Sequence, residues 1–217
     1  MNDSTNSPVV LILGAGPNVG QAVARLFASK GYKVGLAARS LKEVDSTDNQ
    51  LNISSDFSKI DDMVNAFAKV KEAFGIPSVV VYNVSAVSFN PADDPFALSL
   101  ADLSRDMTIN IYSVFVAAQQ AISGFAQLPV SAARTFIYTG NVLNVSILSR
   151  FLSQGIGKFY YADERKPDGS PKYRIDGDAH ANLYWELAHG KTQCPWMQTF
   201  VTGVGYKKFD AICAPLV

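Results

Sequence analysis

The sequence predicts an α/β domain built on a doubly wound parallel sheet. A short apolar run, Val9–Leu13, is followed at once by the glycine-rich turn 14–20 and then by a helix-patterned stretch. Apolar runs and helix-patterned stretches continue to alternate through the first two-thirds of the chain. This alternation is typical of parallel sheets covered by helices on both faces. The length of 217 residues suits a single domain of this kind.

Each strand is predicted from an apolar run that lies between turn signals. The predicted strands are Val9–Leu13, Lys33–Ala38, Leu51–Ile53, Ser78–Tyr82, Thr135–Tyr138, 159–163 and Met197–Val201. We therefore expect a sheet of six or seven parallel strands joined by right-handed crossovers.

Helices are predicted where apolar residues recur at a spacing of three and four. Val19, Val23 and Phe27 share one face of the first helix, and Gly31 is a natural C-terminal stop. The other predicted helices cover 60–74, Leu100–Phe125 and Ala179–Ala188. The linker 39–52 is short and polar, so we expect little or no helix there.

Composition and charge give no sign of a nucleic-acid, membrane or metal partner. Lys plus Arg and Asp plus Glu number 19 each, and this balance does not favour nucleic acid or an anionic membrane surface. The sequence has no apolar run long enough for a membrane span, and residues 1–7 lack a signal pattern, so we expect a cytoplasmic protein. His180 and His189 form no spaced cluster with cysteines, and no metal site is predicted.

The expected organisation is a disordered tail over residues 1–8 and one nucleotide-binding domain over residues 9–217. The partner expected for that domain is a small-molecule substrate, and a homo-oligomeric state is left open.

The turn 14–20 has the features of a pyrophosphate-binding turn. Gly14 permits a tight turn, and Gly16 lets the backbone approach a phosphate closely. Gly20 is the third glycine of the same turn. The helix that starts near Val19 offers unpaired N–H groups and a positive dipole end to an anion. We therefore predict a dinucleotide at this turn.

The residues that follow the other strands should lie beside the dinucleotide, because ligands of such sheets bind at the carboxyl ends of the strands. The residues in these positions are Arg39 and Ser40, Asp56 and Phe57, Asn83, Val84 and Ser85, and Gly140 and Asn141. An acid after the second strand would bind the ribose hydroxyls of NAD. Arg39 and Ser40 stand there instead, and they suit the 2′-phosphate of NADP.

These motifs resemble the short-chain dehydrogenase/reductase family from about Val9 to about Gly177. The turn 14–20 resembles the family's glycine-rich turn, with Asn18 where the middle glycine usually stands; asparagine adopts positive φ more readily than most residues. The resemblance implies a Rossmann-like fold and an NAD(P) cofactor.

Three further segments carry the resemblance. Asp56-Phe57 resembles the position that contacts the adenine ring. The segment 82–85 resembles the Asn-Asn-Ala-Gly stretch beside the cofactor, and 106–110 resembles the helix segment that carries the family's structural and catalytic asparagine, here Asn110.

The catalytic positions depart from the family's pattern. Alignment on the fifth strand places the family's serine at Asn141, its tyrosine at Gln154 and its lysine at Lys158. Glutamine has no ionisable proton, so Gln154 cannot act as general acid. Asn141 could still donate a hydrogen bond to a carbonyl oxygen, and Lys158 could still hold the nicotinamide ribose. Tyr160 and Tyr161 are alternative proton sources, although core packing is the better interpretation of both.

Three functional hypotheses follow. The first is an NADP-dependent oxidoreductase that reduces a carbonyl or imine or oxidises an alcohol. The second is a catalytically inactive dinucleotide-binding module, such as a redox sensor or an interaction protein. The third is a scaffold that binds no nucleotide, because the segment between the fifth and sixth strands, 144–158, is short for a parallel crossover.

Overall fold

The computed structural model describes residues 7–89, 97–140 and 158–209. It contains an eight-stranded sheet with the order β3-β2-β1-β4-β5-β6-β7-β8. The strands are β1 Val9–Leu13, β2 Lys33–Ala38, β3 Gln50–Ser54, β4 Val79–Tyr82, β5 Thr135–Thr139, β6 Lys158–Glu164, β7 Met197–Val201 and β8 Gly205–Tyr206. All neighbouring strands pair in parallel except β7 and β8. The doubly wound class is confirmed, and the strand count is corrected: a short antiparallel hairpin adds β8.

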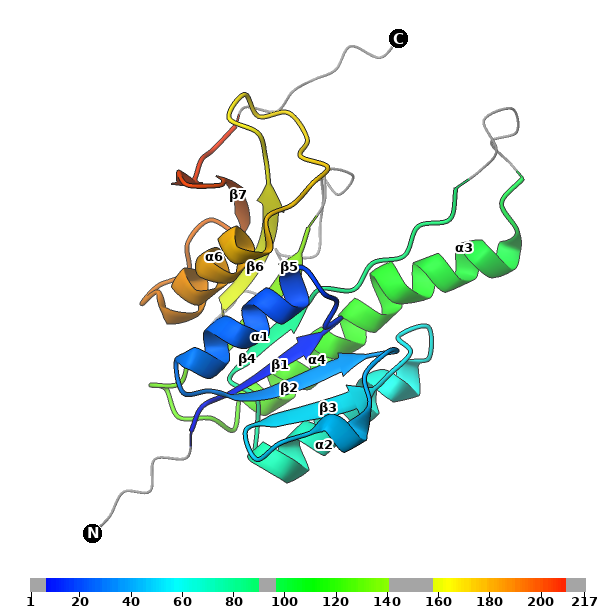
Figure 1. The fold of residues 1–217 in the computed structure, drawn as a ribbon, viewed down its shortest axis with the longest axis vertical. Helices are drawn as coiled ribbons and strands as arrows, with labels where there is room; N and C mark the ends of the chain where they lie inside the picture. Colours follow the sequence, from blue (N-terminus) through cyan, green and yellow to red (C-terminus); the bar gives the residue numbers. More distant parts are fainter. Residues whose placement is uncertain (1–6, 90–96, 141–157, 210–217) are drawn as a thin grey trace.

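Helices cover both faces of the sheet (Figure 1). Helices α1 (Val19–Ser29) and α6 (Gly177–His189) pack together on one face, and α2 (Ile60–Phe74) and α4 (Ser113–Phe125) pack on the other. Each face has its own apolar core, because alternate residues of every strand point to opposite sides. The linker after β2 contains only a short 3₁₀ turn, Glu43–Asp45, as expected.

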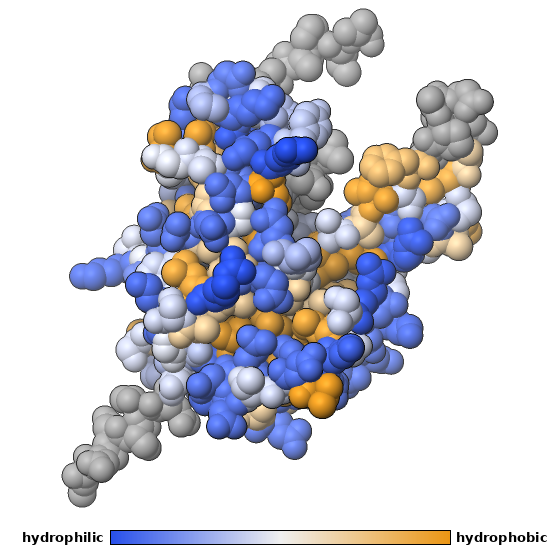
Figure 2. All heavy atoms as spheres, in the orientation of Figure 1, coloured by the Kyte–Doolittle hydropathy of each residue, from blue (hydrophilic) through white to orange (hydrophobic). Residues whose placement is uncertain are grey.

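The predicted helix Leu100–Phe125 is one long rod with a defect in the middle. It comprises α3 (Leu100–Met107), a π-helical segment η2 (Thr108–Tyr112) and α4. Helix α3 extends beyond the sheet (Figure 1), and hydrophobic side chains gather on this projecting arm in the space-filling view (Figure 2). Within the described ranges, no helix is long and apolar enough to cross a membrane.

The order of the strands in the sheet indicates the edge at which a ligand can bind. Strand β1 lies between β2 and β4, so the connections after β1 and β4 leave in opposite directions. A crevice at the carboxyl ends of such strands is where doubly wound sheets bind ligands. The connection between β5 and β6 has only 18 residues, 140–157.

Candidate functional site

Two glycines of the 14–20 turn are required by packing within the protein. Gly14 has φ +89°, and a Cβ atom there would lie 2.6 Å from the backbone oxygen of Asn83. A Cβ atom at Gly20 would lie 2.6 Å from Cα of Ala15. The Gly14 amide donates to the carbonyl of Ala37 in β2, at 2.9 Å. The turn is thus fixed against both strands that flank β1.

Gly16 differs, because the protein itself does not require a glycine there. A Cβ atom at Gly16 would meet no atom of the described residues within 4 Å. The space in front of it is open, as expected where a ligand approaches the backbone closely. The start of α1 is also prepared for an anion: its N-cap residue, Asn18, makes no side-chain cap bond, and the first turn holds no acid.

Asn18 has a role that the sequence did not suggest. Its φ is −90°, so the turn forms without a positive φ at this position. Its Nδ2 donates to the backbone carbonyl of Ile175 at 3.1 Å, and a Cβ atom at Gly177 would lie 2.4 Å from its Oδ1. The side chain therefore ties the glycine turn to the connection between β6 and α6, residues 165–176, instead of capping α1.

The turn faces a cavity of about 510 Å³ at the carboxyl edge of the sheet. Its lining residues come from the ends of β1, β4, β5 and β6 and from the β6–α6 connection. They are 16–19, Asn83, Val84, Ser85, Thr139, Gly140, Asp163, Glu164, 171–173 and Ile175. A glycine is needed at Gly140, because a Cβ atom there would lie 2.2 Å from the ring of Tyr161. The predicted positions after β1, β4 and β5 are thus brought together around one cavity.

Asn83 and Asn110 both hold backbone in place. Asn83 donates from Nδ2 to the carbonyl of Gly14 at 2.9 Å. Asn110 makes a reciprocal pair with Ala86: Nδ2 donates to its carbonyl at 2.7 Å, and Oδ1 accepts from its amide at 3.1 Å. The amide group of Asn110 is satisfied by this pair, so in this arrangement it positions the segment after β4, next to the π-helical defect.

Arg39 and Ser40 are exposed immediately after β2, at the carboxyl edge as predicted. Asp56 follows β3, and the pKa of its carboxyl is lowered, first by hydrogen bonds from Ser58 and also by the charges of Lys59 and Arg39. Arg39 therefore lies within electrostatic range of Asp56.

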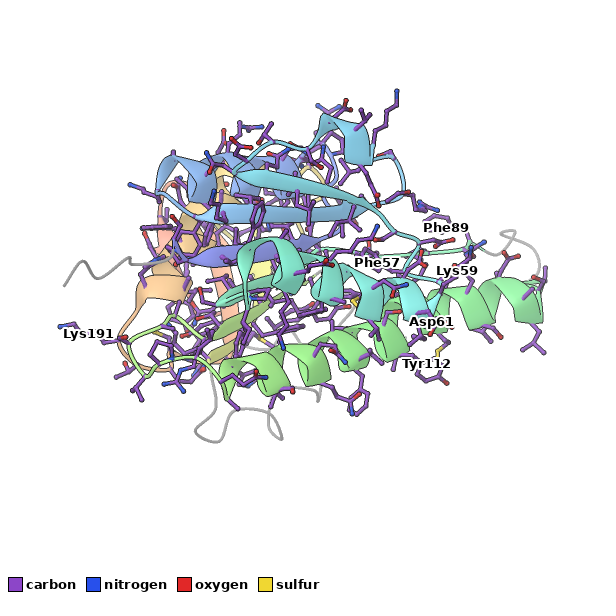
Figure 3. The ribbon with its side chains drawn as sticks, turned by 90° about the horizontal axis from the view of Figure 1, so that it is seen from below. Phe57, Lys59, Asp61, Phe89, Tyr112 and Lys191 are labelled. Atoms are coloured by element: carbon purple, nitrogen blue, oxygen red, sulfur yellow. The ribbon has the colours of Figure 1, made fainter. Side chains whose placement is uncertain are left out.

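Phe57 does not fit the predicted role beside an adenine ring. Its side chain is only 4% exposed and packs in the core with Tyr82, at a ring distance of 6.5 Å. Figure 3 shows it inside the molecule near the start of α2. The ring of Phe57 thus serves the hydrophobic core and is not available to contact an adenine ring.

The structure places Lys158 away from the predicted cofactor site. It is the first residue of β6, so it lies at the amino edge of the sheet. Its Nζ donates to the carbonyls of Leu187 and Gly190, each at 2.8 Å, and burial lowers the pKa of this amine. Lys158 thus caps the C-terminal end of α6.

The amino edge has a concavity of its own, of about 1100 Å³, lined by Lys158 and Lys191 among others. Figure 3 shows Lys191 at the left end of the molecule, away from Phe57, which lies right of the centre. This concavity is larger than the one beside the glycine turn, but the described residues that line it include neither the glycine turn nor a helix N-terminus. We therefore place the candidate site at the carboxyl edge.

None of the other predicted catalytic or proton-donating residues contributes a described side chain to the cavity lining. Asn141 and Gln154 lie outside the described residues. Tyr160 and Tyr161 are both buried, on opposite faces of β6, and neither lines the cavity. The hydroxyl of Tyr160 accepts from the amide of Cys194 at 3.2 Å.

Sequence reasoning missed a buried ionic cluster at the end of β6. The Glu164 carboxylate is fully buried and accepts hydrogen bonds from Lys172 and Thr202 and, at 2.7 Å, from the amide of Asp176. His180 Nδ1 lies 3.7 Å from the same carboxylate. The cluster fixes the β6–α6 connection over the cavity. The sequence shows only Glu164 itself, an acid at the carboxyl end of β6, and no short spacing marks its partners.

The protonation states of this cluster follow from burial and hydrogen bonding. Burial alone would raise the pKa of Glu164, but the hydrogen bonds from Lys172, Thr202 and the Asp176 amide outweigh it and lower that pKa. Burial lowers the pKa of His180. Burial raises the pKa of Asp163, although Arg165 pairs with it at 2.6 Å. Among the described residues, no group of three or more His, Cys, Asp or Glu could hold a metal ion.

Comparison with known proteins identifies relatives of the whole chain. The family model for short chain dehydrogenase matches residues 8–148. The "short chain dehydrogenase/reductase dmxR12" of Cryptosporiopsis sp. (strain 8999) is 41% identical over 239 residues, which cover 95% of this chain and 96% of the relative.

Solved structures share the fold at low sequence identity. A metagenomic short-chain oxidoreductase in complex with NADP is 16% identical, with a TM-score of 0.74 over 91% of this chain and 99% of that one. The 3-ketoacyl-(acyl-carrier-protein) reductase of Brucella melitensis complexed with NADH is 16% identical, with a TM-score of 0.68 over 90% and 97%.

Two details of these matches bear on the missing catalytic residues. The match to the family model ends at residue 148, before Gln154 and Lys158. Moreover, 95% of 217 residues is about 206, so an aligned length of 239 leaves about 30 positions at which this chain has no residue.

Proposed function

Because the chain belongs to the short-chain dehydrogenase family, we propose that its carboxyl-edge cavity binds NADP(H). We further propose that the bound cofactor exchanges a hydride with the carbonyl or imine of a small substrate, or with the corresponding alcohol. The observation that carries the proposal is the open space at Gly16, beside the uncapped start of α1 and within a 510 Å³ cavity. This arrangement suits a pyrophosphate.

When bound, the cofactor supplies the hydride chemistry, and the chain supplies binding and orientation. The amides at the start of α1 hold the phosphates, and Gly16 gives them access to the backbone. Asn83 and Asn110 hold the segments after β1 and β4 in register beside the cavity. Asn18 and Glu164 hold the β6–α6 connection in place where it lines the cavity.

The preference for NADP over NAD rests on Arg39 and Ser40, which stand where an NAD-binding chain has an acid. In an NADPH and NADH titration followed by nucleotide fluorescence, we expect tighter binding of NADPH. The Arg39→Asp variant removes the cation and adds a group that repels the 2′-phosphate but accepts from ribose hydroxyls. We expect the preference of this variant for NADPH over NADH to fall by about tenfold or more, which is the loss expected from removing one charge-assisted hydrogen bond. An unchanged preference in Arg39→Asp would contradict the assignment.

A non-catalytic dinucleotide-binding module is the second candidate, and the position of Lys158 favours it. The family's lysine acts beside the nicotinamide, whereas this lysine caps α6 at the far edge of the sheet. A screen of carbonyls, imines and alcohols with NADP(H) separates the two candidates. Turnover supports the oxidoreductase, and tight cofactor binding without turnover supports the module.

A further inference from the structure

A buried hydroxyl pair connects α6 to the cavity wall. The Oγ1 atom of Thr139, at the end of β5, lies 2.7 Å from the hydroxyl of Tyr184 in α6. Tyr184 is fully buried, whereas Thr139 is partly exposed and lines the cavity. Thr139 is therefore the member of the pair that a ligand can reach.

The burial of Tyr184 determines the direction of the hydrogen bond. A buried hydroxyl with no acceptor for its proton is costly, and within the described part of the chain Thr139 is the hydrogen-bond partner of Tyr184. Of the two possible directions, donation from Tyr184 to Thr139 Oγ1 is the one that pairs the buried phenol proton. Burial also raises the pKa of Tyr184, so this phenol keeps its proton throughout the neutral range. The proton of the Thr139 hydroxyl is left for another acceptor.

We propose that the Thr139 hydroxyl donates a hydrogen bond to an acceptor oxygen of the bound dinucleotide. The proposal rests on the proposed function, since it assumes that NADP(H) occupies the cavity. Neighbouring side chains at the strand ends already have partners within the protein. Asn83 is hydrogen-bonded to the glycine turn, Asp163 is paired with Arg165, and Glu164 is paired with Lys172. Thr139 is a positioning residue that presents its donor from the rigid end of a strand.

The experiment uses a double substitution that leaves no buried polar group without a partner. Replacing Thr139 alone by valine would leave the buried Tyr184 hydroxyl without a hydrogen-bond partner. A loss of stability could then not be separated from a loss of NADPH binding. The Thr139→Val, Tyr184→Phe variant removes both hydroxyls at nearly constant shape, so we expect its melting temperature to stay close to that of the wild type. Tyr184→Phe alone is the matched control, because it keeps the Thr139 donor.

Binding of NADPH is measured by isothermal titration for the wild type and both variants. We expect the double variant to raise Kd by about three- to tenfold, the range for one hydrogen bond, and the control to stay within about twofold of the wild type. If the double variant binds as tightly as the control, the inference is overturned while the proposed function stands. If the wild type binds neither NADPH nor NADH, both are overturned.

Discussion

Replacing Gly14 by alanine is expected to lower the free energy of unfolding by about 3 kcal/mol. The residue has φ +89°, which costs an L-residue about 1–2 kcal/mol. In addition, the new Cβ would lie 2.6 and 2.7 Å from the backbone O and C of Asn83. That backbone is held by the hydrogen bond from the Asn83 amide to Leu13 and cannot move aside freely, so overpacking adds to the strain. Urea unfolding gives the value.

Gly31 provides the control for Gly14. It also has positive φ, +83°, but a Cβ atom there would meet no atom within 4 Å in the described part of the chain. Gly31→Ala should therefore cost only the conformational strain, about 1 kcal/mol. Equal losses in the two variants would show that the glycine turn is not packed against the end of β4 as described here.

Replacing Glu164 by glutamine is expected to cause the second large loss in the free energy of unfolding. The carboxylate is fully buried with Lys172, and the substitution leaves that ammonium without its counter-charge. Removing one partner of a buried pair typically costs about 3–5 kcal/mol. Because Lys172 keeps some exposure, we expect a loss near the lower end of that range in urea unfolding. The control is Glu43→Gln, whose exposed pair with Lys69 should contribute less than about 1 kcal/mol.

The stability difference between the wild type and Glu164→Gln should also depend on pH. The pKa of Glu164 is lower in the folded protein than in the unfolded chain, where glutamates have a pKa of about 4.3. Its stabilising contribution is therefore present above that pH and is lost as the pH falls through the folded pKa. The stability difference between wild type and Glu164→Gln should shrink below about pH 4. A difference that stays constant down to pH 3 would contradict the buried carboxylate.

Much of the fold could be predicted because it depends on local patterns. The run Val9–Leu13 and the helix after it follow from apolar periodicity and from the glycines that end each element. The long helix Leu100–Phe125 was also predicted, but its π-helical defect at 108–112 was not. The short strand β8 was missed, because a two-residue hairpin strand has no periodicity to detect.

The site was predicted only where it is local in sequence. The positions of the 14–20 turn and of Asn83 at the cavity follow from the rule about strand ends. Lys158 was misplaced because the family spacing assumes a full-length crossover, and with 18 residues between the strands this lysine begins β6 instead. The Glu164 cluster joins β6, the β6–α6 connection and Thr202, so no short spacing in the sequence marks it.

The most direct test of the dinucleotide site is an NADPH titration of the wild type and of Gly16→Val. Because the space at Gly16 is open, this variant should fold normally and melt within a few degrees of the wild type. We expect its affinity for NADPH to fall by about tenfold or more, since the side chain occupies the space that the phosphates need. A folded Gly16→Val protein that binds NADPH as tightly as the wild type would contradict a phosphate site at this turn.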